Sequence, residues 1–287
     1  MSAATINTCA ACGKEGDCLK SCGACKLVKY CSRECQANHR PMHKKECKKR
    51  AAELYDEKLF KEVELDECPL CFLILPSADL TTIKSCCGKT ICNGCVYAMK
   101  MSEGGANVCA FCRTPPPSSD EDEIKRVKSL MDKGNAEACF LLAGYYVNGS
   151  RGLTRDYQKA NELHLKAGEL GCAGAYFNLG DSFFKGKGLE VDKKKAKHYW
   201  ELAAMGGYVP ARYNLGIEEL ETRKIERAFK HFILAARAGS ERALESVKIG
   251  FMKGLVTKEQ YASALRAYQK IHDGMKSDAR DKAAASR

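Results

Sequence analysis

Cysteine and histidine residues follow one another at short, regular intervals near the start of this 287-residue chain. Residues 31–47 read CSRECQANHRPMHKKEC, in which Cys31 and Cys35 are four residues apart, as are His43 and Cys47. Two residues at this spacing lie on one face of a helix, so both side chains reach one point. Thiolate and imidazole groups that meet at one point bind zinc. Because this stretch has almost no apolar residues to pack, we expect bound metal to replace a hydrophobic core.

The distribution of the cysteines indicates metal binding rather than disulfide bonds. The N-terminal segment MSAATINTCAACGKEGDC lacks the apolar stretch of a signal peptide, and no apolar run is long enough to span a membrane. We therefore expect a protein of the cytoplasm or nucleus, where thiols stay reduced and CxxC pairs are typical of metal sites. Of the 18 cysteines, only Cys139 and Cys172 lie outside two groups, and we expect both to be small buried hydrophobic side chains.

Four ligand pairs make up the first group, which we assign to a domain of residues 1–50. A CxxC pair turns two sulfur atoms toward one point, so two such pairs and two helical pairs supply eight ligands. Eight ligands complete two tetrahedral zinc sites with no open position, and closed sites are structural. Spacing alone leaves open which pairs share a metal. The eight candidate ligands are Cys9, Cys12, Cys22, Cys25, Cys31, Cys35, His43 and Cys47.

The order of these pairs, with seven residues between Cys35 and His43, resembles the MYND zinc finger. The resemblance implies that alternate pairs share a metal and that the finger binds short peptides, many of which contain proline. Two residues are left over: Cys18 is an alternative to Cys22 as a ligand, and His39 competes with His43, although the spacing favours His43. The implied ligand sets are Cys9, Cys12, Cys31 and Cys35, and Cys22, Cys25, His43 and Cys47.

The second group, which we assign to a domain of residues 66–113, contains the segments CPLC, CCGKTICNGC and CAFC. It resembles a RING zinc finger, except that Lys89 stands where such fingers have a histidine ligand. A protonated lysine has no lone pair for zinc, so the adjacent Cys86 becomes the candidate ligand, as in an eight-cysteine variant of the RING family. The chain would then hold about four zinc ions. The expected ligand sets are Cys68, Cys71, Cys92 and Cys95, and Cys86, Cys87, Cys109 and Cys112.

The resemblance to a RING finger implies a role in ubiquitin transfer. RING ubiquitin ligases do no covalent chemistry themselves, and instead hold a ubiquitin-charged conjugating enzyme in a reactive arrangement. Leu70 and Arg113 match positions at which the family contacts the conjugating enzyme or ubiquitin, and Val96 matches an apolar position after the sixth cysteine. Against this role, Ala110 stands in place of a common proline, and no tryptophan follows Cys95.

The elements that must position these groups are mainly helical. Apolar residues at helical spacing predict a connecting helix over residues 51–65, and the segment TPPPSSDEDE predicts a solvated linker at 114–123. Helical periodicity continues over 124–273, whereas the tail at 274–287 lacks apolar anchors and is expected to fray. The predicted fold is mainly α, with two small zinc-stabilised modules followed by an α-solenoid of helix-pair repeats.

The solenoid is predicted from internal repeats. The segments CFLLAGYYVNG, YFNLGDSFFKG and RYNLGIEELET align, and Gly144, Gly180 and Gly216 recur every 36 residues. A period of this length with paired helices indicates a solenoid, in which small residues let helices cross closely. The pattern resembles Sel-one-like repeats, which are related to tetratricopeptide repeats. We expect a shorter loop in the third unit, aromatic side chains in the core, and a capping helix pair at 250–271.

Charge and motifs narrow the function. The formal net charge is +11, but thiolates and four zinc ions would lower it to about +4, so the basic balance does not favour nucleic acid. The sequence has no nucleophile with a paired base, no phosphate-binding glycine loop and no open metal site. We therefore predict a zinc-binding adaptor that contacts other proteins or peptides. The alternative is a RING-type ubiquitin ligase, with a conjugating enzyme as partner, that selects substrates through the repeats and the MYND finger.

Overall fold

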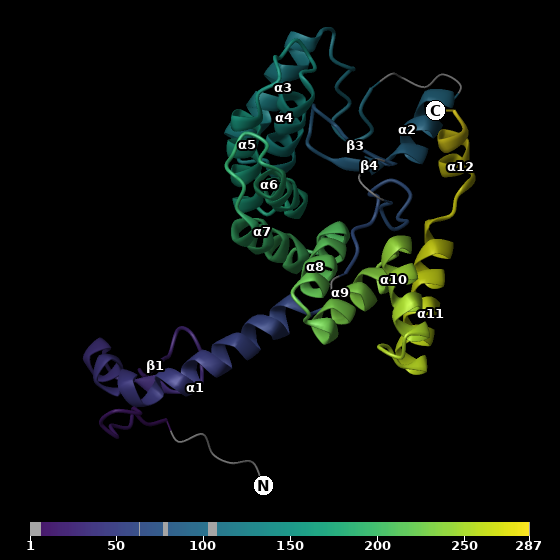
Figure 1. Ribbon diagram of the computed structural model, residues 1–287. Helices are drawn as coiled ribbons and strands as arrows, with labels where there is room; N and C mark the ends of the chain where they lie inside the picture. Colours follow the sequence, from purple (N-terminus) through teal and green to yellow (C-terminus); the bar gives the residue numbers. More distant parts are fainter. Residues whose placement is uncertain (1–6, 63, 77–79, 103–107, 287) are drawn as a thin grey trace. The chain divides into compact units, whose positions relative to one another are not determined.

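The computed structural model describes residues 7–62, 64–76, 80–102 and 108–286. They form two compact units that divide between Lys61 and Glu62. The described residues contain helices α1–α12 and strands β1–β4, which confirms the predicted mainly α fold (Figure 1). The expected domains 1–50, 66–113 and 274–287 each include a few residues outside this range.

The first unit is small and has little apolar core. Strands β1 (Lys20–Ser21) and β2 (Lys29–Tyr30) pair antiparallel, and helix α1 (Arg33–Leu59) follows. The Ser32 side chain caps α1 by accepting a hydrogen bond from the Cys35 amide at 3.1 Å. The core cluster of this unit consists of three cysteines and one tyrosine: Cys9, Cys22, Cys25 and Tyr30.

Helix α1 corrects the expected connecting helix at 51–65. One helix runs from Arg33 to Leu59, through Pro41, so the candidate ligand helix and the connector are the same element. It also ends earlier than expected, because the amide of Phe60 turns back to the carbonyl of Asp56 and closes the last turn. Residue 63, within the expected helix, lies outside the described residues.

The second unit begins with the RING-like segment, by which we mean residues 66–113. Strands β3 (Thr81–Ile83) and β4 (Thr90–Cys92) pair antiparallel, with Thr82 opposite Ile91, and helix α2 (Asn93–Met101) follows directly. Buried Ile91 packs with Cys68 and Cys92, and partly buried apolar residues surround them. Two candidate ligands are therefore part of this small core.

Pairs of helices make up the rest of the second unit, and successive helices pack against each other (Figure 1). The solenoid helices are α3 (Asp120–Asp132), α4 (Ala136–Asn148), α5 (Tyr157–Glu169), α6 (Ala173–Lys185), α7 (Lys193–Met205), α8 (Val209–Glu221), α9 (Ile225–Arg237), α10 (Glu241–Met252) and α11 (Lys258–Met275). The expected cap at 250–271 corresponds to α10 and α11, so its first helix begins nine residues earlier.

The linker expected at 114–123 is also shorter. Ser119 caps helix α3, whose first turn consists of four acidic residues that favour a helix N-terminus. Arg126 pairs with Asp122 at 2.7 Å and donates a hydrogen bond to the carbonyl of Pro115 at 2.6 Å. Acidic residues that look like part of a solvated linker therefore begin a helix.

The repeated glycines allow close helix crossings in two of the three units. A Cβ at Gly180 would lie 2.6 Å from Trp200 Cδ1, and one at Gly216 would lie 2.4 Å from Phe232 Cε1. At Gly144 no atom lies within 4 Å of the corresponding position. Among the three glycines at the period of 36, only those of the second and third units therefore allow a close helix crossing.

The core of the solenoid contains alanine and a few large side chains. Cys139 and Cys172 are buried in it, as expected. Of the aromatic residues expected there, Trp200 is buried, whereas Tyr176, Phe183 and Tyr199 are only partly buried. Tyr199 stacks between the other two, with ring centroids 5.9 and 5.6 Å away.

The chain ends in an ordered helix rather than in a frayed tail. Helix α12 (Asp278–Ala285) is capped by Ser277 and packs against α2 of the RING-like segment. Ala283 is buried, and Arg280 is hydrogen-bonded to Ile74 and Leu73. The expectation of fraying was wrong because small alanines and one arginine anchor this helix in place of large apolar residues.

Candidate metal centres

Four of the five CxxC pairs form the same tight turn, whereas Cys92 and Cys95 lie at the start of helix α2. In each of the four, the carbonyl oxygen of the first cysteine accepts a hydrogen bond, at 2.8–3.1 Å, from the amide of the residue after the second cysteine. That following residue has a positive φ in all four turns, although only one of the four is glycine. The four residues are Gly13, Lys26, Phe72 and Arg113, with φ of 71°, 61°, 57° and 55°. The turn aims both sulfur atoms at one side, and strained backbone at three of these positions is typical of a functional site.

The sulfur atoms of the first set lie at the distances that zinc requires. Cys9 and Cys12 come from one turn. Cys35 lies in the first turn of α1, and Cys31 directly precedes the capping Ser32. Cys12 Sγ lies 3.7 Å from Cys31 Sγ, and Cys31 Sγ lies 3.5 Å from Cys35 Sγ. A tetrahedral site with zinc–sulfur bonds of about 2.3 Å places its sulfur atoms about 3.8 Å apart, whereas a disulfide needs about 2.05 Å. The set fits zinc and not a disulfide.

The second set combines a turn with the middle of α1. Cys25 Sγ lies 3.2 Å from His43 Nε2, and Cys22 Sγ lies 3.7 Å from Cys47 Sγ. His43 and Cys25 are both buried. All four ligand atoms lie within 4.8 Å of one another, as do those of the first set. The structure thus brings alternate pairs together, in the arrangement that the MYND resemblance implies.

The two leftover residues of this region lie outside both sets. Cys18 is exposed. His39 accepts or donates a hydrogen bond with the Tyr30 hydroxyl at 3.0 Å, and its ring stacks on His43 at 5.6 Å. Its role here is to pack against the ligand histidine.

The RING-like segment contains two further sets of four cysteines. In one, Cys68 Sγ lies 3.8 Å from Cys95 Sγ, and Cys71 Sγ lies 3.8 Å from Cys92 Sγ. In the other, Cys86, Cys87, Cys109 and Cys112 place their sulfur atoms within 4.8 Å of one another. These are the same two sets that the sequence predicts, and zinc coordination by each remains a prediction.

The local backbone explains how the adjacent residues Cys86 and Cys87 reach one point. The amides of Cys87 and Gly88 both donate to the carbonyl of Lys84, at 3.2 and 2.7 Å, and Gly88 has a φ of 70°. This tight turn brings Cys87 Sγ to 3.7 Å from Cys109 Sγ. Lys89, in the position of the usual histidine, is exposed.

Without a cation, each set holds thiols that cannot all ionise. Hydrogen bonds from the amides of Cys31 and Cys12 lower the pKa of Cys9 to about 6. Hydrogen bonding to Cys35 and to the thiolate partners around it raises the pKa of Cys31 to about 12. In the second set, the pKa of Cys22 falls to about 6 while burial and Cys22 raise that of Cys47 to about 11. A divalent cation would remove this conflict, because all four ligands could then be negative or neutral donors to it.

We expect the substitution Cys86→Ser to lower the bound zinc by about one ion per chain, because a serine hydroxyl is a poor zinc ligand beside three thiolates. Elemental analysis of purified, untagged protein would measure this change. Cys18→Ser is the matched control, since Cys18 is exposed and outside the four sets. An unchanged zinc content in Cys86→Ser would show that Cys86 is not a ligand.

The two residues predicted to contact a conjugating enzyme lie close to these sets. Leu70 is partly buried against the core of the RING-like segment, and Arg113 is exposed in the strained turn after Cys112. Sequence reasoning missed a third residue, Arg280 of α12, whose Nη2 atom lies 3.7 Å from Cys71 Sγ. Burial lowers the pKa of Arg280, but interactions with Cys92 and Cys71 outweigh burial and raise it. Because Arg280 and Cys71 are 209 residues apart in the sequence, no local pattern indicates their contact.

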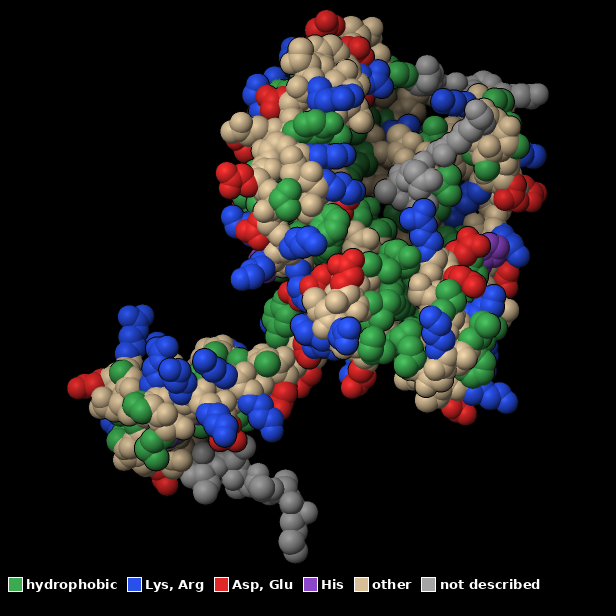
Figure 2. Space-filling model, viewed as in Figure 1, with side chains coloured by type: hydrophobic (Ala, Val, Ile, Leu, Met, Phe, Trp, Pro, Cys, Tyr) green, Lys and Arg blue, Asp and Glu red, His purple; other side chains and the backbone are tan. Residues whose placement is uncertain are grey.

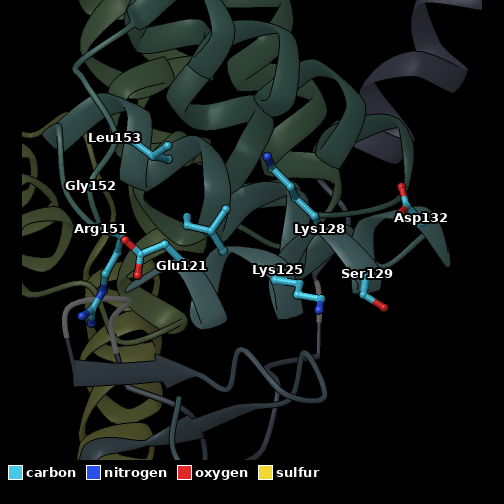
Figure 3. Close-up of a pocket in the computed structure, with 9 residues that line it drawn as sticks. Glu121, Lys125, Lys128, Ser129, Asp132, Arg151, Gly152 and Leu153 are labelled. Carbon is cyan, nitrogen blue, oxygen red and sulfur yellow. The ribbon is translucent and has the colours of Figure 1, made fainter. Parts of the chain in front are cut away.

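A separate hollow of about 580 Å³ lies beside α3 (Figure 3). Its lining includes side chains of both charges, such as Glu121 and Lys125, but no cysteine or histidine. Arg151 at its edge already forms ion pairs with Asp120 and Glu123, at 3.0 and 2.9 Å.

In the part of the chain that the structure describes, no helix has the length and apolar character needed to cross a membrane.

Comparison with known protein families agrees with the geometry of the first unit and of the solenoid. Residues 9–47 match the family model of the MYND finger. The Sel1 repeat model matches three times, at residues 136–172, 173–208 and 209–240. The third match is the shortest, as the sequence predicted. The RING-like segment is suggested by its cysteine sets alone.

Several named proteins are similar over part of their length. One is the ERAD-associated E3 ubiquitin-protein ligase component HRD3B of Arabidopsis thaliana, 30% identical over 39% of this chain and 18% of its own. Another is the E3 ubiquitin-protein ligase DA2 of the same plant, 39% identical over 25% of this chain and 16% of its own. The chain therefore spans less than a fifth of either relative.

Among solved structures, a Sel1 repeat protein from Oxalobacter formigenes is 25% identical, with a TM-score of 0.47 over 54% of this chain and 64% of that one. Two independent family models match the segment that holds the first two ligand sets and the repeated helix pairs. The chain carries a zinc-binding MYND finger at residues 9–47 and three Sel1 repeats at residues 136–240.

Proposed function

We propose that this protein is a zinc-binding adaptor of the cytoplasm or nucleus that brings other proteins together through its MYND finger and its helical repeats. One observation supports this most: each candidate zinc set supplies four protein ligands, which leaves no open coordination position for chemistry. About four zinc ions would then stabilise surfaces and would not act on a substrate. The repeats add a second surface, and two linked weak sites can bind one partner with high avidity.

The MYND finger has exposed features that suit a peptide ligand. Met42 is 84% exposed and Leu27 is 51% exposed, so two large apolar side chains of the finger are open to contact with a ligand. Exposed Lys44 and Lys45 follow Met42 on α1, and basic side chains gather along this helix in Figure 2. We therefore propose that the finger binds short, proline-containing peptides that also carry acidic residues, through apolar contact and charge complementarity.

We expect Met42→Glu to weaken peptide binding by the full-length, zinc-loaded chain by at least about tenfold, because it removes apolar contact and adds a like charge toward an acidic peptide. A peptide display library would supply the ligands, and fluorescence polarisation would measure the dissociation constants. Met252→Glu is the matched control, since Met252 is 74% exposed and lies on α10. Equal affinity in both variants, or a library without enriched proline-containing peptides, would contradict this proposal.

A second candidate function is ubiquitin ligation by the RING-like segment. Two relatives are named as an E3 ubiquitin-protein ligase or as a component of one. In addition, the resemblance to a RING finger matches Leu70 and Arg113 to positions that contact the conjugating enzyme or ubiquitin. In this case a conjugating enzyme is a partner, and the finger and the repeats select the substrate.

A reconstituted reaction would separate the two functions. Purified chain is mixed with activating enzyme, a panel of conjugating enzymes and ubiquitin, and products are followed by gel electrophoresis. Ubiquitin chains that disappear with Leu70→Ala or Arg113→Ala would establish the ligase. Their absence across the panel would support an adaptor without ligase activity. A Cys18→Ser chain is the matched control, because the substitution is exposed and distant from both residues in the sequence.

A further inference from the structure

The C-terminal helix α12 lies directly against the RING-like segment. Gly94 in the first turn of α2 is buried, and a Cβ at this position would lie 2.6 Å from Arg280 Cγ and 2.8 Å from the Arg280 amide nitrogen. Only a glycine lets the α12 backbone come this close. Gly94 also lies between Cys92 and Cys95, so the contact is made within one of the candidate zinc sets.

Arg280 places its guanidinium on the turn that holds this set. Its Nη1 atom donates hydrogen bonds to the carbonyls of Ile74 and Met275, both at 2.9 Å. Its Nη2 atom donates to the carbonyl of Leu73 at 3.4 Å and to Cys71 Sγ at 3.7 Å. The Leu73 carbonyl also accepts from the Cys68 amide at 2.8 Å. One side chain therefore joins the end of the chain to the ligand turn of Cys68 and Cys71.

The chemistry of a four-thiolate zinc site explains why a guanidinium is useful there. Zinc with four thiolates carries a net charge of −2, and a partly buried charge of this size is costly unless cations or hydrogen-bond donors surround it. A guanidinium offers both, and its rigid planar fork holds its donors in fixed directions toward a carbonyl and a sulfur atom, whereas an ammonium is a point charge on a flexible stem. Hydrogen bonds to metal ligands typically change metal affinity by tenfold or more.

We propose that Arg280 is an outer-sphere partner of the zinc site formed by Cys68, Cys71, Cys92 and Cys95, so that the docked helix α12 holds this site closed. Arg280 is a positioning residue, since it acts on the metal through the sulfur atoms of its ligands. The inference depends on zinc binding by this set and is independent of the adaptor role. It connects the last residues of the chain with a metal site about two hundred residues earlier.

The test uses the full-length chain with zinc bound, and compares Arg280→Met with Lys282→Met. Lys282 is exposed on the same helix, so the control removes the same charge without the contact. We expect Arg280→Met to release one zinc per chain about 10–100 times faster to a chromogenic chelator. Peptide mapping after maleimide treatment should show faster alkylation of Cys71 and Cys92, with Cys109 and Cys112 unchanged.

Two further measurements separate this role from a loss of packing. In cobalt-substituted protein, loss of the hydrogen bond to sulfur should shift the thiolate-to-cobalt charge-transfer band to lower energy. Arg280→Lys should restore the packing of α12, seen as normal hydrogen exchange in residues 278–285, but should not restore slow zinc release. Full rescue by lysine would overturn the role of the fork.

The remaining outcomes also decide the inference. Equal zinc release from Arg280→Met and Lys282→Met overturns it, while zinc sets and adaptor role stand. Wild-type protein that contains no zinc on Cys68, Cys71, Cys92 and Cys95 overturns it together with that site. Deletion of residues 277–287 removes Arg280 without a new side chain, and it should release the same single zinc at the faster rate.

Discussion

Removal of zinc by a strong chelator is expected to unfold residues 9–47 while the helices of residues 136–240 remain folded. Binding of a structural zinc ion contributes about 10–16 kcal/mol, as much as or more than the whole stability of a typical domain. The core of the MYND finger has nothing comparable, because three of the four residues in its buried cluster are candidate ligands. Without metal, Tyr30 and a few partly buried neighbours cannot hold the finger together.

Hydrogen exchange followed by mass spectrometry would measure this result peptide by peptide. We expect full exchange within seconds over β1, β2 and the start of α1 after chelation, and unchanged protection over α4–α9, where the structure places no candidate metal set. Zinc added back in excess should restore protection, and Cys18→Ser should behave as the wild type. Persistent protection of residues 31–47 in metal-free protein would contradict the proposed origin of the fold.

Replacement of Phe232 by alanine is expected to destabilise the solenoid by about 3–5 kcal/mol. Phe232 is fully buried in α9, contacts the rings of Tyr213 and Phe229, and fills the space left by Gly216. Gly216, which lies opposite, has no side chain to fill the resulting cavity. The cost therefore includes both lost burial and an empty volume.

Trp200 provides the measurement, because it is the only tryptophan of the chain and is buried in α7. Urea unfolding followed by its fluorescence should show a lower midpoint in Phe232→Ala, since each repeat is stabilised by its neighbours. Ile249→Ala is the control; this side chain is 44% exposed, and the change should stay within about 0.5 kcal/mol. Equal midpoints in the two variants would show that the repeats unfold independently.

Local patterns in the sequence predicted most of the chemistry. The spacing of Cys35, His43 and Cys47 needs only one helix, and these three residues lie on α1 in the structure. Cys31 directly precedes Ser32, the residue that caps this helix. The period of 36 depends on glycines that recur within each unit, and the family model places its repeats at the same positions. The lysine at position 89, where a RING finger has a histidine, also indicated a missing ligand, because a protonated lysine cannot bind zinc. Such signals are readable because the interacting residues repeat at fixed, short distances along the chain.

The boundaries of the elements were less predictable. The expected helix at 51–65 is the second half of α1, and the acidic part of the expected linker begins α3. In both places the sequence contains the necessary residues, such as the capping Ser119, but composition alone does not show whether a turn or a helix uses them.

The sequence by itself determined the candidate ligand sets, their resemblance to two kinds of zinc finger and the repeats, since each depends on neighbours at short, regular distances along the chain. Only the tertiary structure decided that the last helix is ordered and that Arg280 reaches the turn of Cys68 and Cys71. The physical reason is that this contact joins a helix of small residues to a glycine on a distant element. Neither helix α12 nor Gly94 has a periodic or apolar pattern from which the contact could be predicted, so their fit becomes visible only in the folded chain.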